Sequence, residues 1–238
     1  MLINPTIQLV VFDMAGTTIH DDDAVNRCLR DALAVGGVTA SRDDINLVMG
    51  LPKPLAIRDF LTRTEGRPPA AQRVQELHDE FLTRMIRHYQ SDPGIREMPG
   101  ASDVFRALRK AGVLVALDTG FSRPIVNVLL DRLGWQTGDL LATTVTSDEV
   151  PRGRPHPDLL FEAMKRTGVT DVRRVAKVGD TPSDLGEGTS AGCALVVGVT
   201  NGTHTAAQLT AHPHTHLINS LSELLPLVLP SSATPTRT

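Results

Sequence analysis

The sequence predicts an α/β protein with a Rossmann-like, doubly wound parallel sheet and an inserted α-helical cap domain. Short apolar runs alternate along the chain with segments of helical periodicity. Most of these runs lack polar alternation, as expected for parallel strands that are covered on both faces. One helical block, residues 22–97, interrupts this rhythm after the first run, and 238 residues suffice for a core with such an insertion.

Five apolar runs have the length and composition of buried strands, and helical segments separate them. The predicted strands are residues 9–12, 113–117, 142–146, 175–178 and 194–199. The predicted helices are residues 101–111, 122–133 with Ser122 as N-cap, 157–167 and 183–191. In a doubly wound sheet, ligands bind beyond the C-terminal ends of the strands.

Residues 22–97 contain no convincing strand and at least three helical segments. Asp23 would cap a helix over residues 24–35, and a longer apolar stripe runs through residues 70–90. We therefore predict a core domain (1–21 and 98–229), a helical cap domain (22–97) and a disordered tail (230–238). The alternative is a helical excursion that packs into the core domain.

The bulk composition excludes several classes of protein. The net charge is −3 and the basic residues are scattered, so neither a nucleic-acid-binding surface nor a membrane-binding patch is expected. The chain has no apolar run of about 20 residues and no secretory leader pattern. Cys28 and Cys193 are interpreted as free buried thiols, which suits a cytoplasmic protein.

Polar signals fall where the C-terminal ends of strands are expected. Asp13 follows the first strand, and Asp118-Thr119-Gly120 follows the second. Gly153-Arg154-Pro155 comes after a later loop, and Gly179 to Asp184 follow the strand over residues 175–178. A single Asp or Gly at a strand end is only a turn residue. Several such signals at one edge of a sheet predict a site.

The chemistry of these side chains is consistent with binding a phosphoryl group. Asp13 and Asp180, with Asp184 as a further ligand, could hold a hard cation such as Mg²⁺. Thr119, the Gly120 amide and Arg154 could bind phosphoryl oxygens.

At these residues the chain resembles the haloacid dehalogenase superfamily of aspartate-nucleophile phosphotransferases. The resemblance implies a Rossmann-like core, a mobile cap, a magnesium ion and an aspartyl-phosphate intermediate on Asp13. It also implies that the main-chain carbonyl of Ala15 is a metal ligand.

Ala15 stands where phosphate-ester hydrolases of this kind carry a second carboxylate as general acid and base. Alanine cannot protonate a departing alkoxide. A lysine offers another route, because its amine can condense with an aldehyde and the resulting iminium withdraws electrons from a neighbouring carbon–phosphorus bond. Lys53 is the candidate, held in a defined turn of the cap by Gly50 and two prolines.

Three motifs, Asp-Met-Ala-Gly-Thr-Thr from Asp13, Met-Gly-x-x-Lys ending at Lys53, and Gly-Arg-Pro at Arg154, resemble those of phosphonoacetaldehyde hydrolase (phosphonatase) and phosphonatase-like hydrolases. The resemblance implies a nucleophilic Asp13, a Schiff-base Lys53, Asp180 as main metal ligand and a homodimer through the cap. Ala56 replaces a histidine of the phosphonatases, and Pro52 and Pro54 flank Lys53. These departures leave the substrate open between phosphonoacetaldehyde and a related phosphonate.

Two rival functions stay open. One is a phosphomonoester phosphatase of the phosphoglycolate type, and the other is a non-catalytic phospho-ligand sensor.

Several further signals are given structural interpretations. Four histidines, His204, His212, His214 and His216, are assigned to a surface loop rather than a metal site. Asp21-Asp22-Asp23 is assigned to the hinge into the cap, and Trp135 and the phenylalanines to the core. His20 lies one turn beyond Asp13 and could contact substrate.

Overall fold

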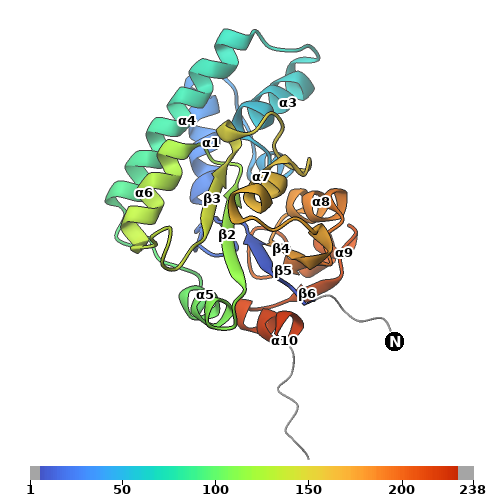
Figure 1. The fold of residues 1–238 in the computed structure, drawn as a ribbon. Helices are drawn as coiled ribbons and strands as arrows, with labels where there is room; N and C mark the ends of the chain where they lie inside the picture. The colour runs from blue at the N-terminus through green and yellow to red at the C-terminus, as the bar shows by residue number, and fades with distance from the viewer. Residues whose placement is uncertain (1–5, 230–238) are drawn as a thin grey trace, which may run out of the picture.

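A six-stranded parallel sheet forms the centre of the computed structural model, which describes residues 6–229 (Figure 1). The strands are β1 (Leu9–Phe12), β2 (Leu114–Thr119), β3 (Thr143–Thr146), β4 (Val175–Gly179), β5 (Leu195–Val199) and β6 (His216–Ile218). Their order is β3-β2-β1-β4-β5-β6, and every neighbouring pair is parallel. The direction of winding therefore reverses between β1 and β4, which is where doubly wound sheets bind ligands. The predicted fold class is confirmed.

Helices cover both faces of the sheet. They are α5 (Ala101–Lys110), α6 (Arg123–Leu133), α7 (Asp158–Thr167), α8 (Pro182–Ala191), α9 (Ala206–Thr210) and α10 (Leu225–Val228). Alternate residues of β1 point to opposite faces, so Leu9 and Val11 pack with α7 while Val10 and Phe12 pack with α5. Both sets are fully buried, which explains why the strand has no polar alternation.

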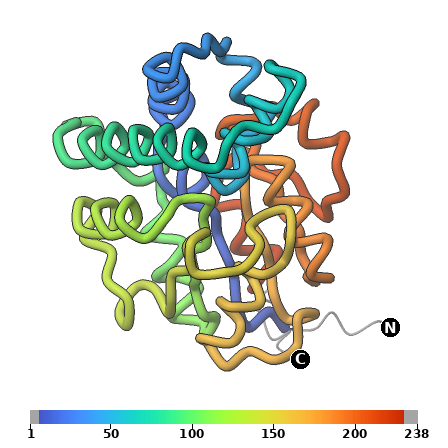
Figure 2. Tube along the Cα trace, turned by 90° about the horizontal axis from the view of Figure 1, so that it is seen from above, coloured from blue at the N-terminus to red at the C-terminus, as the bar shows by residue number. Residues whose placement is uncertain are grey.

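Four helices lie between β1 and α5. These cap helices are α1 (Ala24–Val35), α2 (Arg42–Asn46), α3 (Lys53–Glu65) and α4 (Ala71–Ser91). They lie beyond the end of the sheet where the strands finish, and both views place α4 alongside α6 (Figures 1 and 2). The predicted long helix and its buried stripe agree with α4. The division into two domains with boundaries at residues 22 and 97 stays a prediction.

The two connections to the cap helices run side by side. Ile19 and Glu97 form an antiparallel bridge, the Met98 N–H donates to the Thr18 carbonyl at 2.8 Å, and the His20 N–H donates to Arg96 O at 3.1 Å. The cap segment thus leaves and re-enters the core at one place.

Two local expectations about the cap are wrong. Asp23 occupies the N-cap position of α1 with φ 61°, but its side chain makes no capping bond and pairs with Arg42 at 2.8 Å. Asp21 accepts from the Ala24 N–H at 2.9 Å instead. Lys53 lies not in a turn but at the first position of α3, because prolines before and after it fit a helix start, where backbone N–H groups lack intrahelical partners.

The expectations about core aromatic residues and buried cysteines are correct only in part. Trp135 is buried, whereas Phe161 is 46% exposed and is not a core residue. Cys28 and Cys193 are free thiols, although Cys193 is only partly buried. The predicted tail, residues 230–238, lies outside the described residues. Within those residues, the helices are all too short or too polar to cross a bilayer.

Candidate active site

Asp13 extends β1 by one residue at the point where the sheet's winding reverses. The Asp13 N–H donates to the Val178 carbonyl at 2.9 Å, and Thr18 Oγ1 donates to the Asp13 carbonyl at 2.8 Å. These bonds fix the backbone, so the carboxylate projects from the C-terminal end of the sheet. Burial raises the pKa of Asp13 to about 6, while the Arg154 charge acts against this rise.

Asp180 follows β4 and lies next to Asp13. It accepts from Thr17 Oγ1 at 2.8 Å and from the Thr203 N–H at 2.6 Å. Burial and the charges of Asp13 and Asp184 raise its pKa to about 7. Gly16 has φ 89°, and any Cβ there would overlap the Asp180 carboxylate, so the loop closes tightly over it.

This donor set fits a hard divalent cation. Buried carboxylates that repel one another are relieved by a cation with oxygen ligands, and Mg²⁺ typically takes one or two carboxylates with several waters. The Ala15 residue lines the same cavity as Asp13. Asp13 and Asp180 could therefore supply carboxylate oxygens to such an ion.

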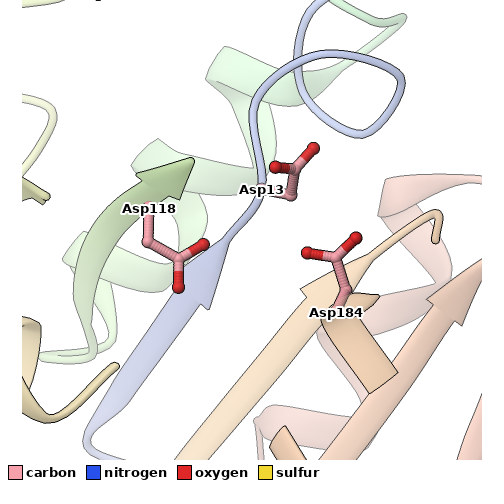
Figure 3. A group of neighbouring side chains, drawn as sticks. All are labelled: Asp13, Asp118 and Asp184. Atoms are coloured by element: carbon pink, nitrogen blue, oxygen red, sulfur yellow. The ribbon is translucent and has the colours of Figure 1, made fainter. Parts of the chain in front are cut away.

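Asp184 is brought to the same place, but its oxygens are already engaged. Asp184 Oδ2 accepts from Thr181 Oγ1 at 2.6 Å in the capping box of α8, and Oδ1 forms an ion pair with Arg154 Nη1 at 2.7 Å. Figure 3 shows Asp13, Asp118 and Asp184 converging from β1, β2 and the start of α8. The Arg154 guanidinium bridges this group, and so supplies positive charge between the three carboxylates.

Arg154 is the most highly connected side chain of the site. Nη1 donates to Asp13 Oδ1 at 2.6 Å, Nη2 donates to the Asp118 carbonyl at 2.8 Å, and Nε donates to Glu187 Oε2 at 3.1 Å. Burial disfavours its charge, but the surrounding carboxylates outweigh burial and raise its pKa well above the ordinary value. The guanidinium is therefore permanently charged and held against the candidate nucleophile.

The sequence analysis missed two members of this network, Lys177 and Glu187, and placed a third, Asp118, at a strand end without giving it a role. Lys177 lies inside β4, Glu187 lies one turn after Asp184 on α8, and Asp118 is the second-last residue of β2. All three are fully buried. The available signals were a lysine in an otherwise apolar strand and two acids spaced three apart on a helix, which places them on one face.

Thr119 and Gly120 border the cavity opposite Asp180. Thr119 Oγ1 accepts from the Phe121 N–H at 3.1 Å, so this residue is fixed by its own turn. A Cβ at Gly120 would lie 2.8 Å from the Leu51 carbonyl of the cap. Glycine is needed at this point because the cap backbone approaches it closely.

Lys53 reaches the cavity from the cap. The residue is 4% exposed, and its Nζ lies 5.7 Å from the Phe121 ring centroid and 5.9 Å from that of Phe81. Burial lowers the pKa of the Lys53 amine to about 8, although the charge of Asp13 acts in the opposite direction. The aromatic faces stabilise the ammonium form only in part, because they replace water with a much weaker partner.

A cavity of about 30 Å³, partly open to solvent, lies between the cap helices and the core. It is lined by Asp13, Ala15, Val25, Met49, Gly50, Lys53, Thr119, Gly120, Phe121, Arg154, Thr181 and Thr203. A space of this size holds water but no organic phosphoryl compound. The cap helices therefore lie against the core with room for water, but not for a substrate, between them.

The remaining sequence assignments are resolved by burial. His204 is 8% exposed and is not a surface histidine; it directly follows Thr203, whose N–H donates to Asp180. His212 is exposed, and His214 and His216 are partly buried. His20 is not among the residues that line the cavity. Ala56 is fully buried one turn into α3 and offers no proton-transfer group.

Comparisons with known proteins agree with this geometry. The family model of haloacid dehalogenase-like hydrolases matches residues 7–192. The phosphonoacetaldehyde hydrolase of Bacillus cereus is 29% identical over 199 residues, covering 78% of this chain and 73% of the relative.

Two solved structures share the fold. One is a phosphonoacetaldehyde hydrolase-like protein from Oleispira antarctica, with TM-score 0.80 and 22% identity over 94% of this chain and 92% of the other. The second is a protein from Lactobacillus delbrueckii subsp. bulgaricus, proposed to be a phosphoglycolate phosphatase, with TM-score 0.77 and 19% identity over 94% and 99%. The family match, which spans more than half of the sequence, establishes that the chain belongs to the haloacid dehalogenase-like hydrolases.

Proposed function

We propose that this hydrolase cleaves the carbon–phosphorus bond of phosphonoacetaldehyde or a related phosphonate aldehyde, by a phosphonatase-type mechanism. The observation that carries this proposal is the position of Lys53, whose amine lines the same small cavity as Asp13 and Arg154. A phosphate-ester hydrolase has no need for a desolvated amine at that point. The similarity to phosphonoacetaldehyde hydrolases supports the same activity.

The reaction begins at Lys53. Its neutral amine adds to the aldehyde carbon, and uptake of one proton from solvent with loss of water leaves a protonated imine on Nζ. An Asp13 oxygen then attacks phosphorus, the carbon–phosphorus bond breaks, and its electron pair moves to the imine nitrogen to give an enamine. Protonation at carbon and hydrolysis release the aldehyde and regenerate Lys53. A second water releases phosphate from Asp13.

The other residues stabilise the transferred phosphoryl group. Arg154 supplies a fixed charge beside Asp13, and Thr119 and the Gly120 amide are placed to donate to phosphoryl oxygens. A magnesium ion bound by Asp13, Asp180, the Ala15 carbonyl and, as a supporting carboxylate, Asp184 would offset the repulsion between the nucleophile and the phosphonate. Enamine departure requires no acid at position 15, which accounts for Ala15.

Borohydride trapping tests the proposal. Wild type incubated with phosphonoacetaldehyde and borohydride should gain one reduced adduct on Lys53 and lose activity, and Lys53→Arg should gain none. Exposed Lys165, 79% exposed in its side chain, supplies the control variant Lys165→Arg, which should label as wild type does. Equal inactivation of wild type and Lys53→Arg would remove the Schiff base from the mechanism.

Phosphate release from a panel of phosphonates and phosphate esters, with detection of adducts on Asp13, separates the rival functions. Rapid hydrolysis of phosphoglycolate that is indifferent to Lys53→Ala would identify a phosphomonoester phosphatase. Failure to form either an aspartyl-phosphate or its beryllofluoride mimic on Asp13, with any substrate, would identify a non-catalytic sensor.

A further inference from the structure

Lys177 is a buried charge that the proposed chemistry does not use. It lies in the middle of β4, between Val11 of β1 and Val196 of β5, and is 1% exposed. It is not among the residues that line the cavity. A buried ammonium is costly unless it is paired and hydrogen-bonded, so its partners indicate its purpose.

All the ionic partners of Lys177 among the described residues belong to the site network. Its Nζ lies 2.8 Å from Glu187 Oε2 and 3.4 Å from Asp184 Oδ1, and it donates to Asp118 Oδ1. An ammonium has three donors, and here three carboxylates surround it.

Arg154 contacts the same three carboxylates. It pairs with Asp118, with Asp184 at 2.7 Å and with Glu187 at 3.1 Å. Only Arg154 reaches further, to Asp13 Oδ1 at 2.6 Å. Lys177 is therefore the second cation of a shared cluster, and Arg154 connects that cluster to the nucleophile.

The packing of α8 on β4 is built around the lysine stem. A Cβ at Gly188 would lie 2.9 Å from Lys177 Cβ and 3.1 Å from its Cγ, so glycine allows the helix to approach. The neighbouring residue Glu187 is thereby brought beneath Arg154, and its Oε1 accepts from the Leu160 N–H at 3.3 Å. The close approach of α8 and the Leu160 N–H of α7 thus fix the Glu187 carboxylate, which Lys177 and Arg154 share.

We propose that Lys177 and Glu187 form a positioning pair that holds the Arg154 guanidinium against Asp13. This inference rests on the proposed role of Arg154 in binding the phosphoryl group. Lys177 neutralises part of the charge of Asp118, Asp184 and Glu187. Without it, these three carboxylates share one cation, and the guanidinium is drawn toward them and away from Asp13.

The test compares Lys177→Met, which keeps the apolar stem, with the double variant Lys177→Met/Glu187→Gln, which removes one cation and one carboxylate together. Lys165→Met is the surface control, since Lys165 lies exposed on α7. Thermal melting checks folding. The readouts are kcat for phosphate release and the affinity for beryllofluoride with Mg²⁺, a phosphate mimic on Asp13 that involves neither Lys53 nor carbon–phosphorus cleavage.

We expect Lys177→Met to lower kcat and beryllofluoride affinity by about 10- to 100-fold, the range for residues that orient a functional side chain. The double variant should recover most of both losses. A Lys177→Met protein within about twofold of wild type would overturn the inference. A double variant that folds but recovers neither kcat nor beryllofluoride affinity would also overturn it. If neither variant folds, the inference is likewise overturned, because the pair would then have only a structural role.

Failure of the positioning pair and failure of the proposed function are distinguishable. If borohydride leaves Lys53 unmodified while beryllofluoride affinity still depends on Lys177, the Schiff base is wrong and the positioning pair stands. If Lys53 is trapped but beryllofluoride affinity is indifferent to Lys177, the reverse holds.

Discussion

The Lys53 amine sets the pH dependence expected of the reaction. Burial brings its pKa to about 8, so at pH 7 about one amine in ten is neutral, against about three in ten thousand at an ordinary lysine pKa. Because the neutral amine attacks the aldehyde, kcat/KM for a phosphonoaldehyde should rise as pH rises toward about 8 and then level. A pH–rate profile measures this rise of kcat/KM with pH.

Hydrolysis of a phosphate ester by the same enzyme is the internal control for that profile. It does not require a neutral Lys53, so the rise near pH 8 should be absent. Identical profiles for both substrates would contradict the assigned role of the amine.

Ala15 gives a second prediction at the level of a single residue. Its side chain borders the cavity beside Asp13, where an aspartate could protonate a leaving alkoxide. Ala15→Asp should raise kcat for phosphate-ester hydrolysis by about 10- to 100-fold, because general acid catalysis typically contributes at least that much. Steady-state kinetics with phosphoglycolate measure the gain.

Ala15→Asn is the matched variant for that experiment. It adds similar volume and polarity without an acid and should give no gain. An equal increase in both variants would attribute the effect to substrate contact rather than to proton transfer.

At the level of elements, glycines allow the cap and the core to approach closely. A Cβ at Gly153 would overlap the Pro52 ring at the start of α3, so Gly153→Ala should hinder closure of the cap helices. We expect kcat/KM for a phosphonoaldehyde to fall by about tenfold or more, since misplacement of a reacting group by about 1 Å can cost up to about 100-fold. Borohydride trapping of Lys53 should slow in parallel.

Gly94→Ala provides the comparison, because Gly94 is exposed in the loop after α4 and far along the chain from this contact. It should retain wild-type kinetics. If Gly153→Ala also traps Lys53 at the wild-type rate, closure does not depend on this contact.

For the whole molecule, magnesium should stabilise the fold through the carboxylates at the C-terminal ends of β1 and β4. Saturation at about 100 times Kd would add about 2.7 kcal/mol to the free energy of unfolding. A chain of this size should then melt about 5–10 °C higher. Asp180→Asn should abolish the shift, and differential scanning calorimetry with and without Mg²⁺ measures it.

Asp103→Asn, at a side chain that is 85% exposed on α5, should retain the full magnesium shift. An undiminished shift in Asp180→Asn would place the stabilising cation elsewhere.

Much of the fold follows from the sequence because its signals are local. Each predicted strand lies within a residue or two of an observed one, since a run such as Val-Val-Phe ending at Phe12 is unambiguous when both faces are buried. The end strand β6 is not among the predicted strands, because His216-Leu217-Ile218 is a run of only three residues and pairing with β5 makes it a strand. Capping by Asp21 rather than Asp23 depends on Arg42, which comes from another helix.

The sequence by itself determined the architecture and the placement of Asp13, Asp180, Thr119 and Arg154 at one edge of the sheet. Parallel strands all end at that edge, so the residue after each strand needs no further information to be placed. Only the tertiary structure decided that Lys53 is enclosed with Asp13, and that Lys177 and Glu187 support Arg154. Burial and charge pairing depend on the distance between elements remote in sequence, and that distance is fixed only by packing.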